Sequence, residues 1–114
     1  DGKGHEAGDA ALQHLVSVTR ECMRAQDTLA RYGGEEFVIL MPDTVLANGI
    51  EAMQRLQRAL TRRYFLAGGE QILITFSAGV AQFEQGESAE SAIKRADQAM
   101  YLAKRAGKNR VLGA

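Results

Sequence analysis

Residues 28–41 read Thr-Leu-Ala-Arg-Tyr-Gly-Gly-Glu-Glu-Phe-Val-Ile-Leu-Met. The runs 28–32 and 35–41 alternate like β-strands, and the pair Gly33-Gly34 lies between them. A tight hairpin turn needs positive φ angles, which glycine adopts at little cost. The stretch therefore predicts a β-hairpin with the two glycines at its tip.

The tip of this hairpin has a composition suited to phosphate chemistry. Gly33 and Gly34 leave backbone N–H groups open to a phosphate, and Glu35 and Glu36 add two carboxylates. Carboxylate oxygens are the ligands that Mg²⁺ bound to nucleotide phosphates prefers, so the tip indicates a nucleoside triphosphate site. An exposed turn with a solvated pair of charges explains the same residues, because short motifs often match by chance.

Length and composition narrow the class of protein. A chain of 114 residues with 46% hydrophobic and 25% charged residues is expected to form a single globular domain. The formal net charge of zero argues against nucleic-acid binding by electrostatics alone. The single cysteine, Cys22, is expected to be a small buried residue in a reducing compartment. No long apolar run is present, so we expect a cytoplasmic location without membrane contact.

Three helices are predicted from apolar residues spaced three and four apart. The first spans 9–24, with Asp9 able to cap its first turn, and the second spans about 44–62. The third spans about 89–106 and stops at Gly107. The expected buried face of the first helix consists of Ala11, Leu12, Leu15, Val16, Thr19, Cys22 and Met23.

The remaining segments predict strands. Gly68-Gly69 marks a turn between two short strands, and the run 72–81 predicts a central strand buried on both faces. Residues 109–112 are expected to add an edge strand. The order of elements predicts an α/β sandwich of the ferredoxin-like or polymerase-palm kind, with a mainly antiparallel sheet flanked by helices.

Four motifs together resemble one family. Residues 33–37 fit GG[DE]EF, residues 4–9 are similar to GHxxGD, residues 77–81 to SxGVA, and residues 95–109 to RADxALYxAKxxGRN. From end to end, the chain resembles the GGDEF-domain family, the diguanylate cyclases. Members of that family place a strand and helices before GHxxGD, so the resemblance implies that the first strand is missing here. We expect residues 1–114 to be a single GGDEF-type nucleotidyl cyclase domain, incomplete at its N-terminus.

The resemblance implies a reaction and a metal site. Two GTP molecules condense to cyclic di-GMP and two pyrophosphates across a homodimer, as each 3′-hydroxyl attacks the α-phosphate of the other GTP. Glu35 matches the metal-binding carboxylate of the family, and Glu36 would complete the metal site or help to activate the hydroxyl. Both are therefore candidate catalytic residues, with Mg²⁺ or Mn²⁺ as cofactor. Gly33 and Gly34 would let the backbone approach the phosphates.

Three further residues match substrate-binding positions of the family. Asp9 matches the residue that reads the guanine edge, and helix capping is its simpler explanation. Lys104 and Lys108 match two basic residues that hold the terminal phosphates, and their spacing of four predicts one shared helix face. A solvated last helical turn, favoured by the helix dipole, is the alternative explanation of these lysines.

A second site is implied just before the hairpin. Arg24 and Asp27 form an RxxD motif that ends five residues before the glycines, as at the inhibitory cyclic di-GMP site of the family. Arg55 matches an arginine that a neighbouring subunit offers to the same ligand. A surface Arg–Asp pair worth well under about 1 kcal/mol is the alternative.

Two functions of different classes stay open. The parent protein is either an active diguanylate cyclase driven by an N-terminal sensor, or a module that binds GTP or cyclic di-GMP without turnover. A cyclase that makes an adenine-containing dinucleotide is less favoured, because Asp9 occupies the guanine-reading position. The resemblance also places an acidic metal ligand and an Asn upstream of Asp1, so this chain alone is expected to be inactive.

Overall fold

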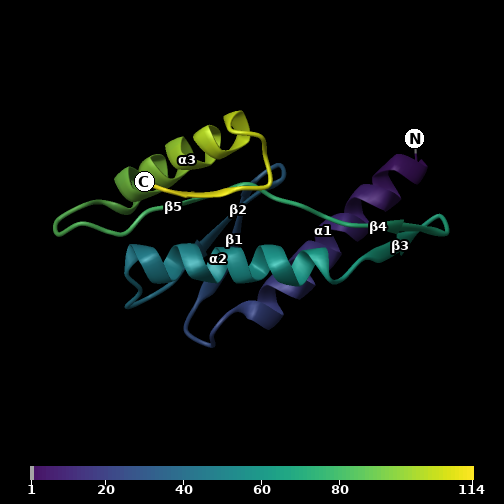
Figure 1. Cartoon of the computed structure of the whole chain (residues 1–114), viewed down its shortest axis with the longest axis horizontal. Helices are drawn as coiled ribbons and strands as arrows, with labels where there is room; N and C mark the ends of the chain where they lie inside the picture. Colours follow the sequence, from purple (N-terminus) through teal and green to yellow (C-terminus); the bar gives the residue numbers. More distant parts are fainter. Residues whose placement is uncertain (1) are drawn as a thin grey trace. The chain divides into compact units, whose positions relative to one another are not determined.

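The computed structural model describes the backbone of residues 2–114 and the side chains from Gly8 onward (Figure 1). Its elements are α1 (Gly2–Cys22), β1 (Thr28–Gly33), β2 (Glu36–Leu40), α2 (Leu46–Thr61), β3 (Phe65–Ala67), β4 (Glu70–Ile72), β5 (Ala78–Val80), α3 (Ala89–Arg105) and β6 (Val111–Gly113). The strands form three pairs, of which β1–β2 and β3–β4 are antiparallel and β5–β6 is parallel. The predicted mixed α/β class is confirmed. None of the described helices is long and apolar enough to cross a membrane.

The elements belong to two compact units, and each is described by itself. The first unit contains the chain up to Pro42 together with Arg58–Ile74. The second contains Asp43–Gln57 and Thr75–Ala114. The candidate site residues are divided between the two units.

Helix α1 supplies much of the core of the first unit. Val18 is completely buried and Thr19 nearly so. The Thr19 hydroxyl is satisfied there, because it donates a 2.7 Å hydrogen bond to the carbonyl of Leu15. His14 joins α1 to the segment at β3. Its Nε2 donates to the carbonyl of Arg63 at 2.9 Å, and its ring lies 5.2 Å from that of Phe65.

Two expectations for α1 are wrong. The helix begins at Gly2, so Asp9 lies inside it, where the backbone N–H groups already bond within the helix and need no cap. Cys22 is exposed rather than buried. Periodicity assigns a residue to a helix face, but only the elements that pack on that face decide its burial.

The predicted central strand 72–81 is also wrong as a single element. β4 ends at Ile72, β5 begins at Ala78, and residues 73–77 pair with no strand in the described chain. Leu73 is 54% exposed, so the first part of the run does not have two buried faces. Apolar, β-branched residues favour an extended chain but do not specify the partner that completes a ladder.

Helix α3 is confirmed together with both of its ends. The Ser88 hydroxyl caps the N-terminus by accepting a 3.1 Å bond from the N–H of Ser91. At the other end, the N–H groups of Gly107 and Lys108 bond to the carbonyls of Lys104 and Ala103, which is the Schellman pattern. The predicted stop at Gly107 is therefore confirmed, and this residue has a φ of 128°.

Arg95 organises the loop before α3, a role that the sequence pattern left unassigned. Its guanidinium donates to the two carboxylate oxygens of Glu87 at 2.8 and 2.6 Å and to the carbonyl of Gln82 at 2.6 Å. The side chain of Gln82 accepts a 2.8 Å bond from the N–H of Leu46, at the first residue of α2. Arg95 therefore ties the loop to α3, and Gln82 ties it to α2.

We expect the substitution Glu87→Gln to remove part of the acid sensitivity of this fold. Hydrogen bonds from Arg95 are the main reason why the pKa of Glu87 is lowered from 4.5 to about 2. A lowered pKa in the folded state stabilises the protein above the unfolded value, and this contribution is lost as the pH falls from 4.5 towards 2. Urea unfolding at a series of pH values measures the difference between the variant and the unmodified protein.

That difference should be largest near neutral pH and shrink as the pH falls. Glu90→Gln is the matched control, because Glu90 lies in the first turn of α3 and has no hydrogen bond or ion pair in the described structure. Equal pH dependence for Glu87→Gln and the unmodified protein would contradict the assignment.

Candidate active site

The hairpin tip differs by one residue from its prediction. Gly33 pairs with Glu36, so the two-residue turn consists of Gly34 and Glu35 rather than the two glycines. Gly34 has a φ of 52°, which glycine adopts without a Cβ clash. The pairing shifts between Arg31 and Gly33, so Tyr32 is an extra residue that increases the local twist. The turn therefore holds Glu35 at the outermost point of the hairpin, with Glu36 at the start of β2.

A second Gly-Gly-Glu sequence in the same chain shows what this register changes. In the β3–β4 hairpin, Ala67 pairs with Glu70, so Gly68 and Gly69 form the turn and Glu70 belongs to the strand. Both glycines there have positive φ angles, 60° and 83°. The sequence Gly-Gly-Glu thus forms two different hairpin tips, and only the β1–β2 hairpin places its carboxylate within the turn.

Arg31 fixes the tip of the first hairpin. Its Nε and Nη2 atoms donate to the carbonyl of Gly34 at 2.9 and 2.6 Å. The charged side chain thereby satisfies the backbone acceptor of the turn residue that precedes Glu35. The sequence pattern did not assign a contact to Arg31. The only signal for this contact was the position of an arginine three residues before Gly34.

The two tip carboxylates are available to a ligand. Glu35 and Glu36 are exposed, and neither forms a hydrogen bond or ion pair with a described residue. Two adjacent hard-oxygen donors fit a divalent cation that is also held by phosphate oxygens. The described side chains contain no group of three or more His, Cys, Asp or Glu residues placed to hold a metal.

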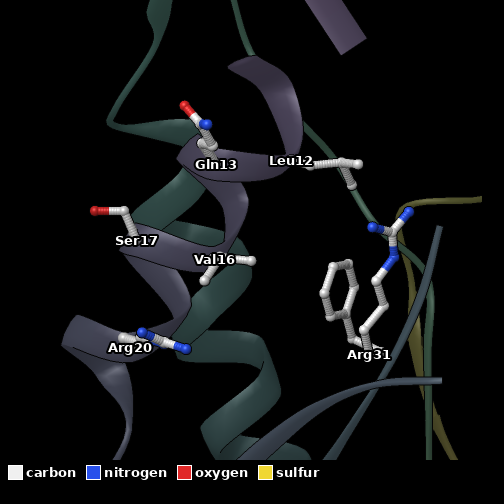
Figure 2. A pocket seen from close by; sticks show the side chains of 7 residues that line it. Leu12, Gln13, Val16, Ser17, Arg20 and Arg31 are labelled. Carbon is white, nitrogen blue, oxygen red and sulfur yellow. The ribbon is translucent and has the colours of Figure 1, made fainter. Parts of the chain in front are cut away.

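An open hollow of about 480 Å³ lies between α1 and this hairpin. It is lined by Leu12, Gln13, Val16, Ser17 and Arg20 of α1 and by Arg31 and Phe37 of the hairpin. Figure 2 shows Leu12 and Val16 extending toward the side of Arg31. Asp9 is exposed and lies three and four residues before Leu12 and Gln13, so it continues the same helix face. The hollow combines an apolar wall with two guanidinium groups, a composition suited to a planar, anionic ligand.

The two candidate phosphate-binding lysines belong to the second unit. Lys104 lies in the last turn of α3, but Lys108 lies beyond the helix end with a φ of 60°, so the predicted shared helix face is wrong. The Schellman turn at Gly107 is the reason, because it ends the helical periodicity between them. Both lysines are exposed, and neither pairs with a described acidic residue.

Arg24 and Asp27 are joined at the start of the hairpin. The Arg24 guanidinium lies 2.8 Å from Asp27 Oδ1, and the backbone N–H of Arg24 donates to Oδ2 at 2.9 Å. The Arg24 side chain also donates to the carbonyl of Pro42 at 2.9 Å. The Asp27 side chain is only 6% exposed, and the guanidinium holds its pKa below the usual value. Arg55 lies in the second unit, 3.5 Å from Glu51.

The structure thus brings together part of the predicted set. The first unit contains Asp9, the tip residues and the Arg24–Asp27 pair, while the second contains Lys104, Lys108 and Arg55. Of the motif at 4–9, Gly8 and Asp9 lie within the described side chains, and the others lie outside them.

A hairpin that presents two unpaired carboxylates beside a tight backbone turn defines this chain as a candidate nucleotide- and metal-binding domain. The family profile described as "Diguanylate cyclase, GGDEF domain" matches residues 1–110. The chain therefore belongs to the GGDEF domain family of diguanylate cyclases, and the resemblance of its four motifs is confirmed.

Relatives and solved structures agree with this assignment. Diguanylate cyclase DgcP of Pseudomonas aeruginosa is 45% identical over 111 residues, which are 97% of this chain and 16% of that protein. Diguanylate cyclase SiaD of the same species, solved in complex with its activator SiaC, superimposes with a TM-score of 0.91 at 32% identity over 97% of this chain and 43% of that one. The GGDEF domain of DgcB from Caulobacter crescentus, solved with c-di-GMP, gives 0.89 at 33% identity, covering 96% and 66%. The chain spans less than a third of the length of DgcP and of two other curated relatives, Diguanylate cyclase A of Treponema denticola and Response regulator PleD of Caulobacter vibrioides.

Proposed function

We propose that residues 1–114 are the catalytic domain of a diguanylate cyclase that condenses two GTP molecules into cyclic di-GMP. The hairpin tip carries this proposal, because Glu35 lies exposed within the turn and Glu36 lies exposed directly after it. No described atom outside the neighbouring residues lies within 4 Å of a Cβ built at Gly33 or Gly34, which supports close approach of a phosphate. In the reaction, each 3′-hydroxyl oxygen bonds to the α-phosphorus of the other GTP. The bond to pyrophosphate breaks, and two pyrophosphates leave.

The other residues have binding roles in this proposal. Gly33 and Gly34 let the chain approach the phosphates, Asp9 accepts from the guanine edge, and Lys104 and Lys108 hold the terminal phosphates. Glu35 and Glu36 hold Mg²⁺ or Mn²⁺, which when bound neutralises charge on the phosphate oxygens. Phosphoryl transfer depends mainly on alignment and charge neutralisation, so no covalent intermediate on the protein is needed.

Two copies are required, because each subunit of a homodimer presents one GTP to the other. The much greater length of the curated relatives supports control of this pairing by further domains, such as an N-terminal sensor. The DgcB complex supports cyclic di-GMP as product and ligand.

The test is incubation of the full-length protein with GTP and Mg²⁺, followed by chromatography of the nucleotides. Formation of cyclic di-GMP supports the proposed enzyme if two GTP molecules are consumed and two pyrophosphates are released for each molecule of product. Stable binding of GTP or cyclic di-GMP without turnover would instead identify the second candidate, a nucleotide-binding module. That alternative remains because the Arg24–Asp27 pair requires no catalysis to bind a ligand.

We further propose that Arg24 and Asp27 form an inhibitory site for the product, to which Arg55 of another subunit contributes. The Arg24 guanidinium is the more exposed partner and can contact phosphate or stack on a base, while the Asp27 carboxylate would accept from a guanine edge. Because Asp27 immediately precedes β1 and Pro42 follows β2, Arg24 contacts both open ends of the hairpin that carries the tip carboxylates.

We expect Arg24→Ala to weaken product inhibition while leaving the initial rate within about twofold. Hydrogen bonds to charged groups contribute about 1.5–3 kcal/mol, so the inhibition constant for added cyclic di-GMP should rise about 10- to 100-fold. Initial rates at increasing cyclic di-GMP measure this constant. Arg62→Ala is the control, since Arg62 is exposed and forms no ion pair with a described residue. Unchanged inhibition in Arg24→Ala would leave Arg24 and Asp27 as a surface pair only.

A further inference from the structure

The loop between α3 and β6 has an unfavourable backbone. Lys108 and Asn109 are consecutive residues with φ angles of 60° and 49°. A Cβ atom makes this left-handed region unfavourable, and residues other than glycine seldom occupy it twice in succession. Such a conformation persists only where surrounding contacts hold it, and it is often retained at sites of function.

Both ends of this loop are anchored by backbone hydrogen bonds. The N–H of Lys108 bonds to the carbonyl of Ala103 at 3.2 Å, which holds the start of the loop against α3. At the other end, the N–H of Ala78 donates to the carbonyl of Arg110 at 2.9 Å, next to the β5–β6 pairing. These bonds restrain the residues on either side of Asn109 but make no contact with Asn109 itself.

Gln57 of α2 makes that contact. Its Nε2 atom lies 2.9 Å from the backbone carbonyl of Asn109 and 3.2 Å from Asn109 Oδ1. A backbone carbonyl can only accept, so the Gln57 atom that faces it must be the amide nitrogen. Gln57, which is 52 residues away in the sequence, therefore donates hydrogen bonds to both the main chain and the side chain of Asn109.

We propose that Gln57 is a positioning residue for nucleotide binding, which holds Asn109 in the left-handed conformation and thereby presents Lys108 to the terminal phosphates of GTP. This inference rests on the proposed function. Lys108 is exposed and has no acidic partner among the described residues, so the strained loop leaves its ammonium group free for an anionic ligand. The direction of the Lys108 side chain depends on how the backbone is held on both sides of it. The bond to Ala103 holds the start of this segment, and Gln57 holds Asn109, the residue that follows Lys108.

A purely structural link between α2 and the loop would predict a different result. Loss of such a link lowers stability, and it either changes kcat and KM together or leaves both unchanged. Loss of a positioning contact weakens an interaction that GTP makes on binding, so KM rises while kcat stays nearly constant.

The experiment compares variants of the full-length protein by steady-state kinetics with GTP and Mg²⁺. Removing hydrogen bonds worth about 1 kcal/mol changes an affinity about fivefold, so Gln57→Leu should raise KM about fivefold with kcat within about twofold. Lys108→Ala should raise KM at least as much. The double variant should be no worse than Lys108→Ala alone, because Gln57 acts through Lys108. Gln54→Leu, an exposed glutamine one turn earlier on α2, should leave KM unchanged.

A rescue variant tests the backbone argument directly. Glycine adopts the left-handed region without a Cβ clash, so Asn109→Gly in the Gln57→Leu background should return KM to within about twofold of the unmodified value. Additive effects of Gln57→Leu and Lys108→Ala, or a KM unaffected by Gln57→Leu, would overturn the inference and leave the proposed function intact.

GTP affinity is measured in parallel by calorimetry with Ca²⁺ in place of Mg²⁺, as a readout besides turnover. If the unmodified protein binds GTP without making cyclic di-GMP, the proposed function fails. The role of Gln57 is then tested by the dissociation constants of the same variants, which should change as expected above for KM. An unmodified protein that binds no GTP would overturn both.

Discussion

Cyclic di-GMP synthesis by the full-length protein falls on the order of 1,000-fold when Glu35 is replaced by glutamine; this is the largest effect on activity that we expect. A metal ligand contributes several kcal/mol to transition-state stabilisation, and each 1.36 kcal/mol corresponds to a tenfold change in rate. The amide keeps the size of the side chain and one acceptor oxygen but removes the charge and the second acceptor oxygen. The rate is measured as cyclic di-GMP formed per minute at saturating GTP and Mg²⁺.

The register of the hairpin explains why we expect so large an effect from this one carboxylate. Glu35 lies within the turn, directly after Gly34, whose carbonyl is held by the Arg31 guanidinium. A metal ligand contributes fully only when its position is set before the substrate binds. Arg31 and the pairing of Gly33 with Glu36 provide that restraint on both sides of Glu35.

The chain contains its own control for this prediction. Glu70 follows Gly68 and Gly69 in a second hairpin, where the register places it in the strand rather than in the turn. Glu70→Gln removes the same charge from the same local sequence, and we expect a rate within about twofold of the unmodified protein. Equal loss of activity in both variants would show that general charge or stability, not the metal site, is responsible.

Local signals predicted the parts of this fold that local chemistry determines. The hairpin follows from glycine between two β-rich runs, and the end of α3 follows from Gly107 as a stop. In each case the residues that specify the conformation are within a few positions of it. The turn was nevertheless displaced by one residue, because the bulge at Tyr32 shifts the pairing in a way that composition does not reveal.

Features that depend on distant partners were missed or misjudged. The run 72–81 has strand composition throughout, yet its middle forms no pairing with the described strands. Arg95 became recognisable as the organiser of the loop only when Gln82 and Glu87 were placed around it. The left-handed conformation of Asn109 likewise depends on Gln57, which no local pattern connects to it. The sequence therefore identified the candidate site residues by family motif, while the contacts that orient them required the structure.

Gly79→Ala is expected to have the largest effect on stability, although it adds only one methyl group. A Cβ at this position would overlap the backbone carbonyl oxygen of Ala96 and the backbone nitrogen of Met100, and would lie 2.9 Å from the Ala96 carbonyl carbon. Backbone atoms cannot rotate away as a side chain does, so α3 must move off β5. Overpacking of this kind costs about 3 kcal/mol. Hydrogen exchange of α3 amides in the full-length protein, and its thermal unfolding, measure the loss.

Gly8→Ala separates this packing effect from the general consequences of replacing glycine. Gly8 lies within α1, and a Cβ there meets nothing within 4 Å. Alanine is favoured over glycine in a helix interior by about 1 kcal/mol, so this control should leave α3 unchanged and stabilise α1 slightly. The two substitutions are chemically identical, and only their neighbours differ. Normal protection of the α3 amides in Gly79→Ala would therefore mean that α3 and β5 do not approach as closely as the structure shows. If protection is lost selectively in α3, the glycine is required for that close approach, because it allows the small face formed by Ala92, Ala99 and Ala103 to pack against the rest of the second unit.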